Sequence, residues 1–302
     1  DVIYAAAPDW IEGYNLTQSA MQKGAPELLY DWQHRLEGGV VTSYQDTAIR
    51  IANAETLAQY GTVSLNWLPD KGDLTVHQVA IIRNGTVIDV IANGTHFDVL
   101  RREQGLEQRL LDGQLTATLT VPGLKLGDVL RIRHSVSLKD QALGDEMQVT
   151  QFLPPKPWNV GYARAIVSWP EGESVFWRAE DGTGIAPPRL VDGYRRLEVA
   201  LPIAKRPEMP SDAPFRYLRP PVLRVGTYAD WQDLSRTMAP HFDRAAQVAG
   251  DSKVAEEAAG IMRLKKDPLE RTAMALRLVQ DDVSYLLNGL DGGNYLPQAA
   301  EE

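Results

Sequence analysis

The sequence predicts a mainly β protein with an α-helical C-terminal part. We expect an antiparallel β-sandwich, built as two sub-sheets or as one large super-sandwich, followed by about three helices. Two observations predict this fold class. Short alternating apolar segments separated by Gly and Asn turns fill residues 40–201, whereas helical periodicity begins only after residue 221. Many short strands joined by tight turns are typical of antiparallel sheets and not of βαβ units.

The strands are predicted from alternation and turn residues. Segments 76–83 and 86–91 flank Asn84-Gly85, a pair suited to the positive φ angles of a type I′ hairpin turn. Segment 114–121 alternates apolar with polar residues, as a strand with one buried face does. Further strands are expected at residues 129–138, 162–169, 174–178 and 194–201.

A proline-rich segment marks the predicted domain boundary. Six prolines crowd into it: Pro202, Pro207, Pro210, Pro214, Pro220 and Pro221. Because proline cannot donate to a sheet ladder and breaks a helix interior, residues 202–221 should form an extended connector. We therefore expect residues 1–221 to form the β-sandwich domain and residues 222–302 to form the helical part.

Three helices are predicted after the connector. Thr227 and Asp230 suggest a capping box for the first, and the second covers residues 254–264. The third has the clearest start, with Asp267 as N-cap and Pro268 at the first helical position. Its apolar residues fall on one face at helical spacing: Leu269, Ala273, Leu276, Val279 and Val283.

Composition excludes several classes of function. The chain contains no Cys, which removes disulfides, thiolate zinc sites and cysteine nucleophiles. A net charge of −9 argues against nucleic-acid binding, and no apolar run reaches the roughly 18 residues of a membrane span. The five His are scattered without metal-binding spacing, so we expect no catalytic, metal or cofactor site.

Two weaker patterns leave room for a binding or catalytic surface. Trp158, Trp169 and Trp177 cluster near a proline-rich seam, and exposed aromatics on a β-sandwich can hold a glycan or peptide. Core packing is the interpretation that we favour for each ring. His96 and Asp98 lie two apart in a predicted strand, where they would share one face, as in a histidine oriented by a carboxylate. An exposed polar face beside a turn explains the same spacing.

The order of several motifs resembles one family. The β part contains Arg83-Asn84-Gly85-Thr86-Val87 and the Pro-Gly-x-x-x-Gly-Asp turn of residues 122–128. The tail contains Tyr-Ala-Asp-Trp at 228–231, Val-Gln-Asp-Asp-Val-Ser-Tyr at 279–285 and Gly-Gly-Asn-Tyr-Leu-Pro at 292–297. This order is similar to that of bacterial envelope proteins in which a β-rich domain of unknown function precedes a transglutaminase-like domain.

The resemblance implies a cleft, a location and a missing nucleophile. It places Gln280, Tyr285 and Tyr295 near the cleft of an incomplete transglutaminase-like α+β domain. In that family a Gly-Asp-Cys segment opens the nucleophile helix, and a Cys thiolate then attacks an amide or ester carbonyl. This sequence has no such segment, so the remainder of that domain is expected beyond Glu302. The parent protein would be periplasmic or exported, with its signal peptide absent from this sequence or removed.

Two functional interpretations follow. The first is a non-catalytic N-terminal fragment of a transglutaminase-like cysteine peptidase or acyltransferase, whose β domain binds a substrate or partner. The alternative is a complete non-catalytic binding protein of the cell envelope that recognises protein or glycan. An exposed apolar groove on the helices would favour the first, because monomers rarely expose large apolar patches.

Overall fold

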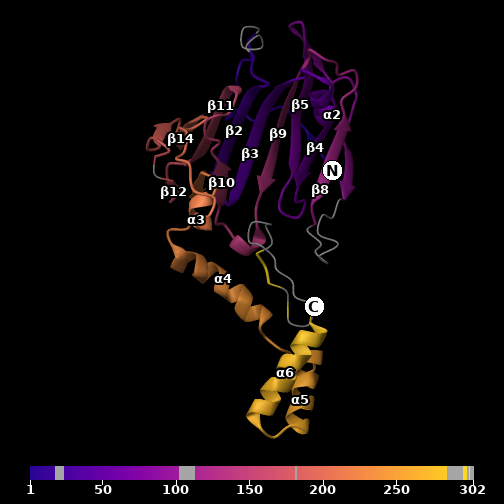
Figure 1. Ribbon diagram of the computed structural model, residues 1–302, viewed down its shortest axis with the longest axis vertical. Helices are drawn as coiled ribbons and strands as arrows, with labels where there is room; N and C mark the ends of the chain where they lie inside the picture. Colours follow the sequence, from indigo (N-terminus) through magenta and orange to yellow (C-terminus); the bar gives the residue numbers. More distant parts are fainter. Residues whose placement is uncertain (18–23, 102–112, 181, 284–294, 298, 300–302) are drawn as a thin grey trace. The chain divides into compact units, whose positions relative to one another are not determined.

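The computed structural model describes residues 1–17, 24–101, 113–180, 182–283, 295–297 and 299. The chain divides into two compact units (Figure 1). Asp1–Arg102 and Gly113–Ala229 form the first, which we call the β unit, and Asp230–Glu302 belong to the second, the helical unit. The β unit continues past residue 221, where we expected the boundary, because β15 (Val222–Gly226) pairs with strands from earlier in the chain.

A nine-stranded sheet forms the centre of the β unit. Its strands follow the order β1-β5-β9-β3-β2-β11-β14-β13, and β6 pairs with β5. The strands are β1 (Ile3–Tyr4), β2 (Glu27–Glu37), β3 (Val40–Arg50), β5 (Leu74–Arg83), β6 (Thr86–Asp89), β9 (Val129–Leu138), β11 (Val160–Pro170), β13 (Arg189–Val191) and β14 (Tyr194–Leu201). Most neighbours are antiparallel, as expected, but β1 runs parallel to β5 and β2 runs parallel to β11. The large sheet is therefore mixed.

Two three-stranded sheets complete the β unit. The first consists of β10 (Gln148–Phe152), β15 and β12 (Phe176–Ala179). The second consists of β4 (Thr62–Trp67), β8 (Leu115–Thr120) and β7 (Asp98–Arg101), and the short helix α2 (Ala54–Tyr60) precedes β4. Together with the large sheet they form the layered β architecture that the sequence predicts.

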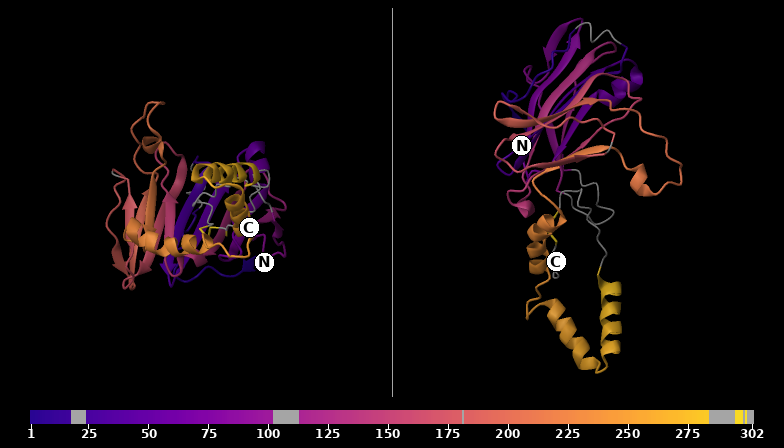
Figure 2. Two further views of the ribbon diagram at one scale, coloured as in Figure 1. Left: turned by 90° about the horizontal axis from the view of Figure 1, so that it is seen from below. Right: turned by 90° about the vertical axis from the view of Figure 1, so that its left-hand side faces the viewer.

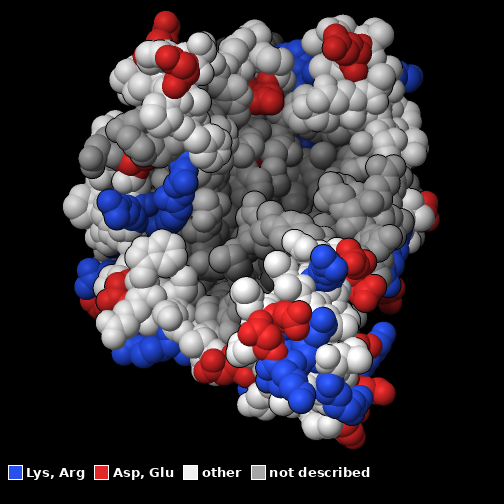
Figure 3. Space-filling view, turned by 60° about the horizontal axis from the view of Figure 1, so that its bottom comes forward, with Lys and Arg blue, Asp and Glu red and all other residues white. Residues whose placement is uncertain are grey.

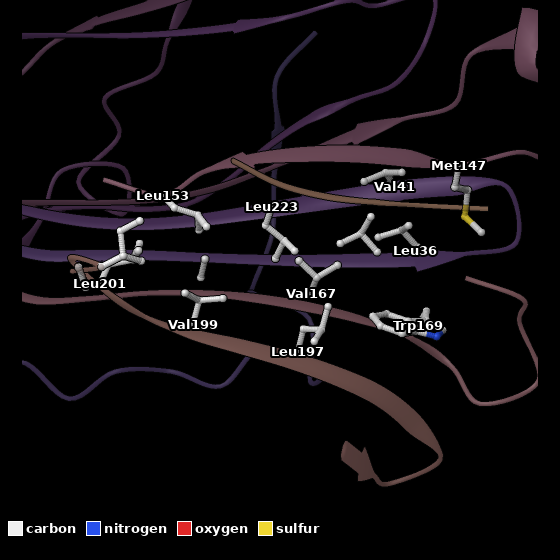
Figure 4. Packing of buried hydrophobic residues seen from close by; sticks show 14 residues of the cluster. Leu36, Val41, Met147, Leu153, Val167, Trp169, Leu197, Val199, Leu201 and Leu223 are labelled. Atoms are coloured by element: carbon white, nitrogen blue, oxygen red, sulfur yellow. The ribbon is translucent and has the colours of Figure 1, made fainter. Parts of the chain in front are cut away.

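Both small sheets pack on the same face of the large sheet. One hydrophobic cluster joins Val41 and Val167 of the large sheet to Leu223 of β15 (Figure 4). A second cluster joins Ile132 of the large sheet to the β4 sheet. Val41 and Thr47 lie on one face of β3, since residues an even number apart share a face, and Thr47 pairs with Ile132. The two cores therefore lie side by side on one surface.

Local sequence signals account for several of these elements. Asn84 and Gly85 have φ angles of 50° and 82° and join β5 to β6, which confirms the predicted hairpin. The predicted strands at 129–138 and 194–201 are β9 and β14. The connector that precedes β15 carries the short helix α3 (Phe215–Leu218) and projects away from the sheets in both views of Figure 2.

The helical unit contains α4 (Trp231–Ala245), α5 (Lys253–Leu264) and α6 (Pro268–Asp282). Asp267 caps α6 as predicted, since its carboxylate accepts a hydrogen bond of 3.0 Å from the Glu270 N–H. Asp230 alone caps α4, because the Thr227 hydroxyl instead accepts a hydrogen bond from the Met147 N–H in the β unit. Among the described helices, none combines the length and the apolar character needed to cross a bilayer.

The apolar face predicted for α6 lies exposed. Its side chains Leu269, Leu276 and Val279 are 78%, 55% and 51% exposed. Residues on another side of the helix, Met274 and Leu278, are half-buried. This exposure is unusual, because an amphipathic helix normally buries its apolar stripe.

Candidate functional site

A cleft of about 710 Å³ lies next to β4, where neither small sheet covers the large sheet. Its floor comes from β2, β3 and β9, and its wall comes from α2 and β4. The lining residues are Glu27, Leu29, Tyr30, Trp32, Ser43, Gln45, Thr47, Ile49, Gln59, Tyr60, Thr62, Val63, Ser64, Leu65, Asn66, Ile132, His134 and Val136. Figure 3 shows charged side chains of both signs, Lys and Arg as well as Asp and Glu, distributed over the described surface in that view.

Strand register arranges the floor as rows. Trp32 pairs with Gln45, and Gln45 pairs with His134, so these three side chains stand in one row across β2, β3 and β9. Tyr30 begins the next row, opposite Thr47. Because directly opposed residues have Cβ atoms about 5 Å apart, each row presents adjoining side chains to one ligand. The floor therefore combines large rings with neutral hydrogen-bonding groups.

An aromatic series borders this floor along β2. The ring centroids of Tyr30 and Trp32 are 6.0 Å apart, and Trp32 stacks on His34 at 5.8 Å and 25°. Trp158 meets Tyr30 edge-on at 5.1 Å. Its indole N–H donates a hydrogen bond of 2.6 Å to Glu27, the one carboxylate among the lining residues. The floor is thus aromatic and nearly free of charge.

Two polar atoms of the central row are buried without a hydrogen-bond partner among the described residues. They are Nε1 of Trp32 and Nδ1 of His134. Burial lowers the pKa of His134 to about 4, with a further contribution from nearby His77, so its imidazole is neutral at physiological pH. A buried polar group left unpaired costs about 1–3 kcal/mol. Each such group in a folded protein calls for an explanation, and a ligand that supplies the missing hydrogen-bond partner is one.

Ser43, which lines the cleft, is hydrogen-bonded to the buried His34, as a nucleophile is to its general base. His34 Nδ1 lies 2.8 Å from Ser43 Oγ, and His34 Nε2 lies 2.8 Å from Gln151 Oε1. Burial lowers the pKa of His34, so it can accept the Ser43 proton only as a neutral base. An imidazolium formed there would face a neutral amide where serine hydrolases place a carboxylate. Replacing that carboxylate by an amide costs on the order of 10⁴ in kcat in such enzymes. The pair is therefore suited to structure and not to acyl transfer.

The opposite face of the large sheet holds a buried charged layer. Arg164 donates two hydrogen bonds of 2.9 Å to the carboxylate of Asp31, and both side chains are almost fully buried. Arg131 binds Asp46 in the same two-bond manner. Since successive residues of β2 point to opposite faces, placing Asp31 in this layer places Tyr30 and Trp32 on the cleft floor.

The three tryptophans considered from the sequence belong to one hydrophobic cluster. Trp169 is 2% exposed and lies inside it, whereas Trp158 and Trp177 are half-buried and pack against it. They therefore do not form an exposed aromatic surface, because their rings fill the space between the large sheet and β15. Trp158 alone borders the cleft, through its contact with Tyr30.

The remaining sequence-derived candidates lie apart from this cleft. Gln280 is exposed on α6, Tyr295 is half-buried, and Tyr285 lies outside the described residues, so the cleft that they were expected to line stays a prediction. His96 is exposed and meets the Tyr4 ring edge-on at 5.3 Å. Within the described part of the chain, no hydrogen bond joins it to Asp98.

Sequence reasoning missed the strand that supplies the floor. β2 alternates Tyr30, Trp32, His34 and Leu36 with polar residues, which is a period-of-two signal. The alternation was missed because the polar residues between these side chains, such as Asp31 and Gln33, are also buried, on the opposite face of the sheet. Among the described residues, no cluster of three or more His, Asp or Glu is placed to hold a metal ion.

Comparison with known proteins identifies the β unit. Residues 38–201 match DUF3857, a domain of unknown function for which a structure has been solved. The chain belongs to the DUF3857 family. Its match covers β3 to β14, and therefore most of the large sheet and part of the cleft floor. A search of curated proteins gives no match to this DUF3857 chain.

Solved structures confirm the fold at low sequence identity. The DUF3857 chain superposes on a "putative protease" from Parabacteroides distasonis with a TM-score of 0.62 and 15% identity, over 89% of this chain and 52% of that one. It thus spans about half the length of that protein. An M1 zinc metallopeptidase from Deinococcus radiodurans matches with a TM-score of 0.32 and 14% identity, over 68% of this chain and 42% of its own. That score is too low to relate the two folds.

Proposed function

We propose that the β unit is a non-catalytic binding domain that holds a segment of another polypeptide in the cleft. One observation carries this proposal: the cleft floor is built from aromatic and neutral hydrogen-bonding side chains in register across three strands. Aromatic rings supply contact area at low entropic cost, and neutral polar groups fix orientation. This combination suits a peptide or a glycan and offers no cationic group to a phosphate.

The chemistry of the described residues that line the cleft supports a binding role. The sequence contains no Cys, and Ser43 pairs with a histidine that lacks a carboxylate partner. No lining residue supplies a second carboxylate that could join Glu27 in general acid–base chemistry. The cleft would therefore retain a ligand without converting it.

We further propose that this chain forms the N-terminal part of a longer, periplasmic or exported transglutaminase-like protein. The motif order along the chain and its membership of the DUF3857 family support this proposal. The exposed apolar face of α6 supports it as well, because the rest of a transglutaminase-like domain would cover that face. The β unit would then position a substrate or partner for chemistry performed elsewhere in the parent protein.

The binding role can be tested with the 302-residue chain and two sets of probes. We would titrate blocked, uncharged peptides and neutral oligosaccharides and follow binding by calorimetry. Trp32→Ala should reduce peptide affinity at least about tenfold, since an aromatic anchor is worth about 2 kcal/mol or more. Trp231→Ala is the matched control, because Trp231 is 85% exposed in the helical unit. Gln45→Glu, which places a charge on the floor, is a second variant that does not remove a ring.

Three results would contradict the proposal. Binding of oligosaccharide without peptide would favour the glycan-recognising alternative. Binding unaffected by Trp32→Ala and Gln45→Glu would place the ligand outside the cleft. Amide or ester hydrolysis by the purified chain that disappears in Ser43→Ala would make the cleft catalytic.

A further inference from the structure

Strand β4 presents its edge, and not one face, to the cleft. It is the outer strand of the β4-β8-β7 sheet and pairs with β8 alone among the described strands. All five residues from Thr62 to Asn66 line the cleft. Successive strand residues point to opposite faces of a sheet, so only a space that runs along the strand edge can touch all of them.

The backbone groups on this edge follow from the pairing with β8. The Val121 N–H donates a hydrogen bond of 2.9 Å to the Gly61 carbonyl, which makes Gly61 and Val121 a hydrogen-bonded pair. In an antiparallel ladder such pairs alternate, so Val63 and Leu65 also direct their backbone groups to β8. Thr62, Ser64 and Asn66 lie between these pairs, so they direct their backbone N–H and C=O groups toward the cleft. No hydrogen bond from the described residues reaches these backbone groups.

The two edges of this small sheet are built differently. β7, on the far edge, is four residues long and carries the charged side chains Asp98 and Arg101. β4 is six residues long, with the sequence Thr-Val-Ser-Leu-Asn-Trp, and carries no charge and no proline. Proteins protect free edges with short strands, charges or proline, because an unprotected edge pairs readily with another strand. Only the edge that faces the cleft lacks this protection.

We propose that an extended, uncharged segment of a partner protein binds in the cleft by adding to β4 as a further strand. This inference rests on the proposed binding function and specifies how the peptide would bind. The free backbone groups of Ser64 and its neighbours would pair with the segment, while Tyr30 and Trp32 on the floor would contact its alternate side chains. The segment must be nearly neutral, because Glu27 is the single carboxylate among the lining residues and is already bonded to Trp158.

The test separates backbone pairing from other contacts in the cleft. The probe is a library of blocked seven-residue peptides in which Ser or Thr alternates with Val, Leu or Tyr. Ser64→Pro removes the N–H that faces the cleft and leaves the β8 ladder intact, because that N–H does not point to β8. Ser64→Ala controls for the side chain. Val99→Pro is the matched control on the opposite edge, where the Val99 N–H also points away from β8 by the same alternation.

We expect Ser64→Pro to weaken peptide binding on the order of tenfold or more, and both controls to stay within about twofold. Amide exchange at Thr62, Ser64 and Asn66 should be fast in the free chain and slow on peptide addition. This second measurement needs no variant, so it decides the question even where Ser64→Pro fails to fold.

Each other result has a defined meaning. Retained binding by a folded Ser64→Pro variant, combined with loss in Trp32→Ala, would overturn strand addition and leave the proposed function standing. Binding of no peptide by the wild-type chain would overturn both. Slow exchange at Ser64 in the free chain would show that its own chain covers the edge. Protection that rises with protein concentration would show pairing with a second copy.

Discussion

His34 and Ser43 face each other across β2 and β3, with His34 Nδ1 2.8 Å from Ser43 Oγ. The other side of the ring fixes the tautomer. Gln151 donates a hydrogen bond of 2.7 Å from Nε2 to the Phe152 carbonyl, so its Oε1 accepts from His34 Nε2. His34 Nδ1 is then the acceptor for the Ser43 hydroxyl. This chain of hydrogen bonds attaches β10 to the large sheet beside the cleft floor.

Gln151→Leu should destabilise the β unit by about 1–3 kcal/mol, because it leaves His34 Nε2 buried without an acceptor. Chemical denaturation followed by tryptophan fluorescence would measure the change. Gln148→Leu on the same strand is the control, since Gln148 is exposed, and its effect should stay within about 0.5 kcal/mol. Equal effects of the two substitutions would show that the hydrogen bond contributes nothing measurable.

His134 should make stability depend on pH between about 6.5 and 4. Its pKa is lowered from 6.5 to about 4 in the folded chain, mainly by burial. In this window the unfolded chain binds the proton and the folded chain does not, so stability falls as pH falls. The loss attributable to this group is at most about 3 kcal/mol. Unfolding free energies measured at pH 7 and pH 4.5 would reveal it.

The variant His134→Leu should flatten this pH dependence. A smaller slope should remain, because burial also lowers the pKa of His77 and of His34. A slope identical in wild type and His134→Leu would contradict the assignment.

Local signals made much of the fold predictable. The Asn84-Gly85 turn predicted its hairpin, and the alternation of residues 129–138 predicted β9. Each pattern is compatible with one backbone conformation of low energy. β15 was missed at the start of the part predicted to be helical, since its pairing with β10 and β12 depends on residues far away in the sequence. The parallel pairing of β2 with β11 is equally long-range and leaves no local signature.

The candidate site was less accessible to sequence reasoning. Trp32 and Gln45 meet across the β2–β3 hairpin, but His134 comes from far along the chain and joins them only through strand register. Aromatic content drew attention to Trp169 as a candidate for ligand binding, although core packing was the favoured interpretation from sequence. Burial decides between them, and burial is a tertiary property.

The Asp31–Arg164 pair should be important to stability although it lies on the face opposite the cleft. Arg164→Met should cost about 3–5 kcal/mol, because it leaves the Asp31 carboxylate buried and uncompensated. Burial already raises the pKa of Asp31 against the effect of Arg164, so the variant should take up a proton there and become less stable as pH rises.

Two comparisons test this interpretation. Asp31→Leu combined with Arg164→Met should recover much of the lost stability, since the double variant buries no unpaired charge. Arg189→Met breaks the exposed pair with Glu198, in which Arg189 is 68% exposed, and should cost under about 1 kcal/mol. A double variant less stable than Arg164→Met alone would refute the argument from uncompensated charge.

Gly72→Ala should destabilise the β unit strongly. A Cβ atom at Gly72 would lie 1.9 Å from the Ser137 carbonyl oxygen and 2.5 Å from its carbon. Both belong to the backbone of β9, so no side-chain rotation relieves the clash. Separating the two segments would break the Ser137 N–H to Asp73 carbonyl hydrogen bond of 3.0 Å. We expect a loss of about 2 kcal/mol or more, measured as the free energy of unfolding.

Gly172→Ala is the matched control for this substitution. No heavy atom lies within 4 Å of a Cβ at Gly172, and its φ lies outside the left-handed region. The change should therefore be neutral or slightly stabilising, because alanine lowers the entropy of the unfolded chain. If Gly72→Ala were as well tolerated as Gly172→Ala, then β5 could not begin as close to β9 as the Gly72–Ser137 approach requires.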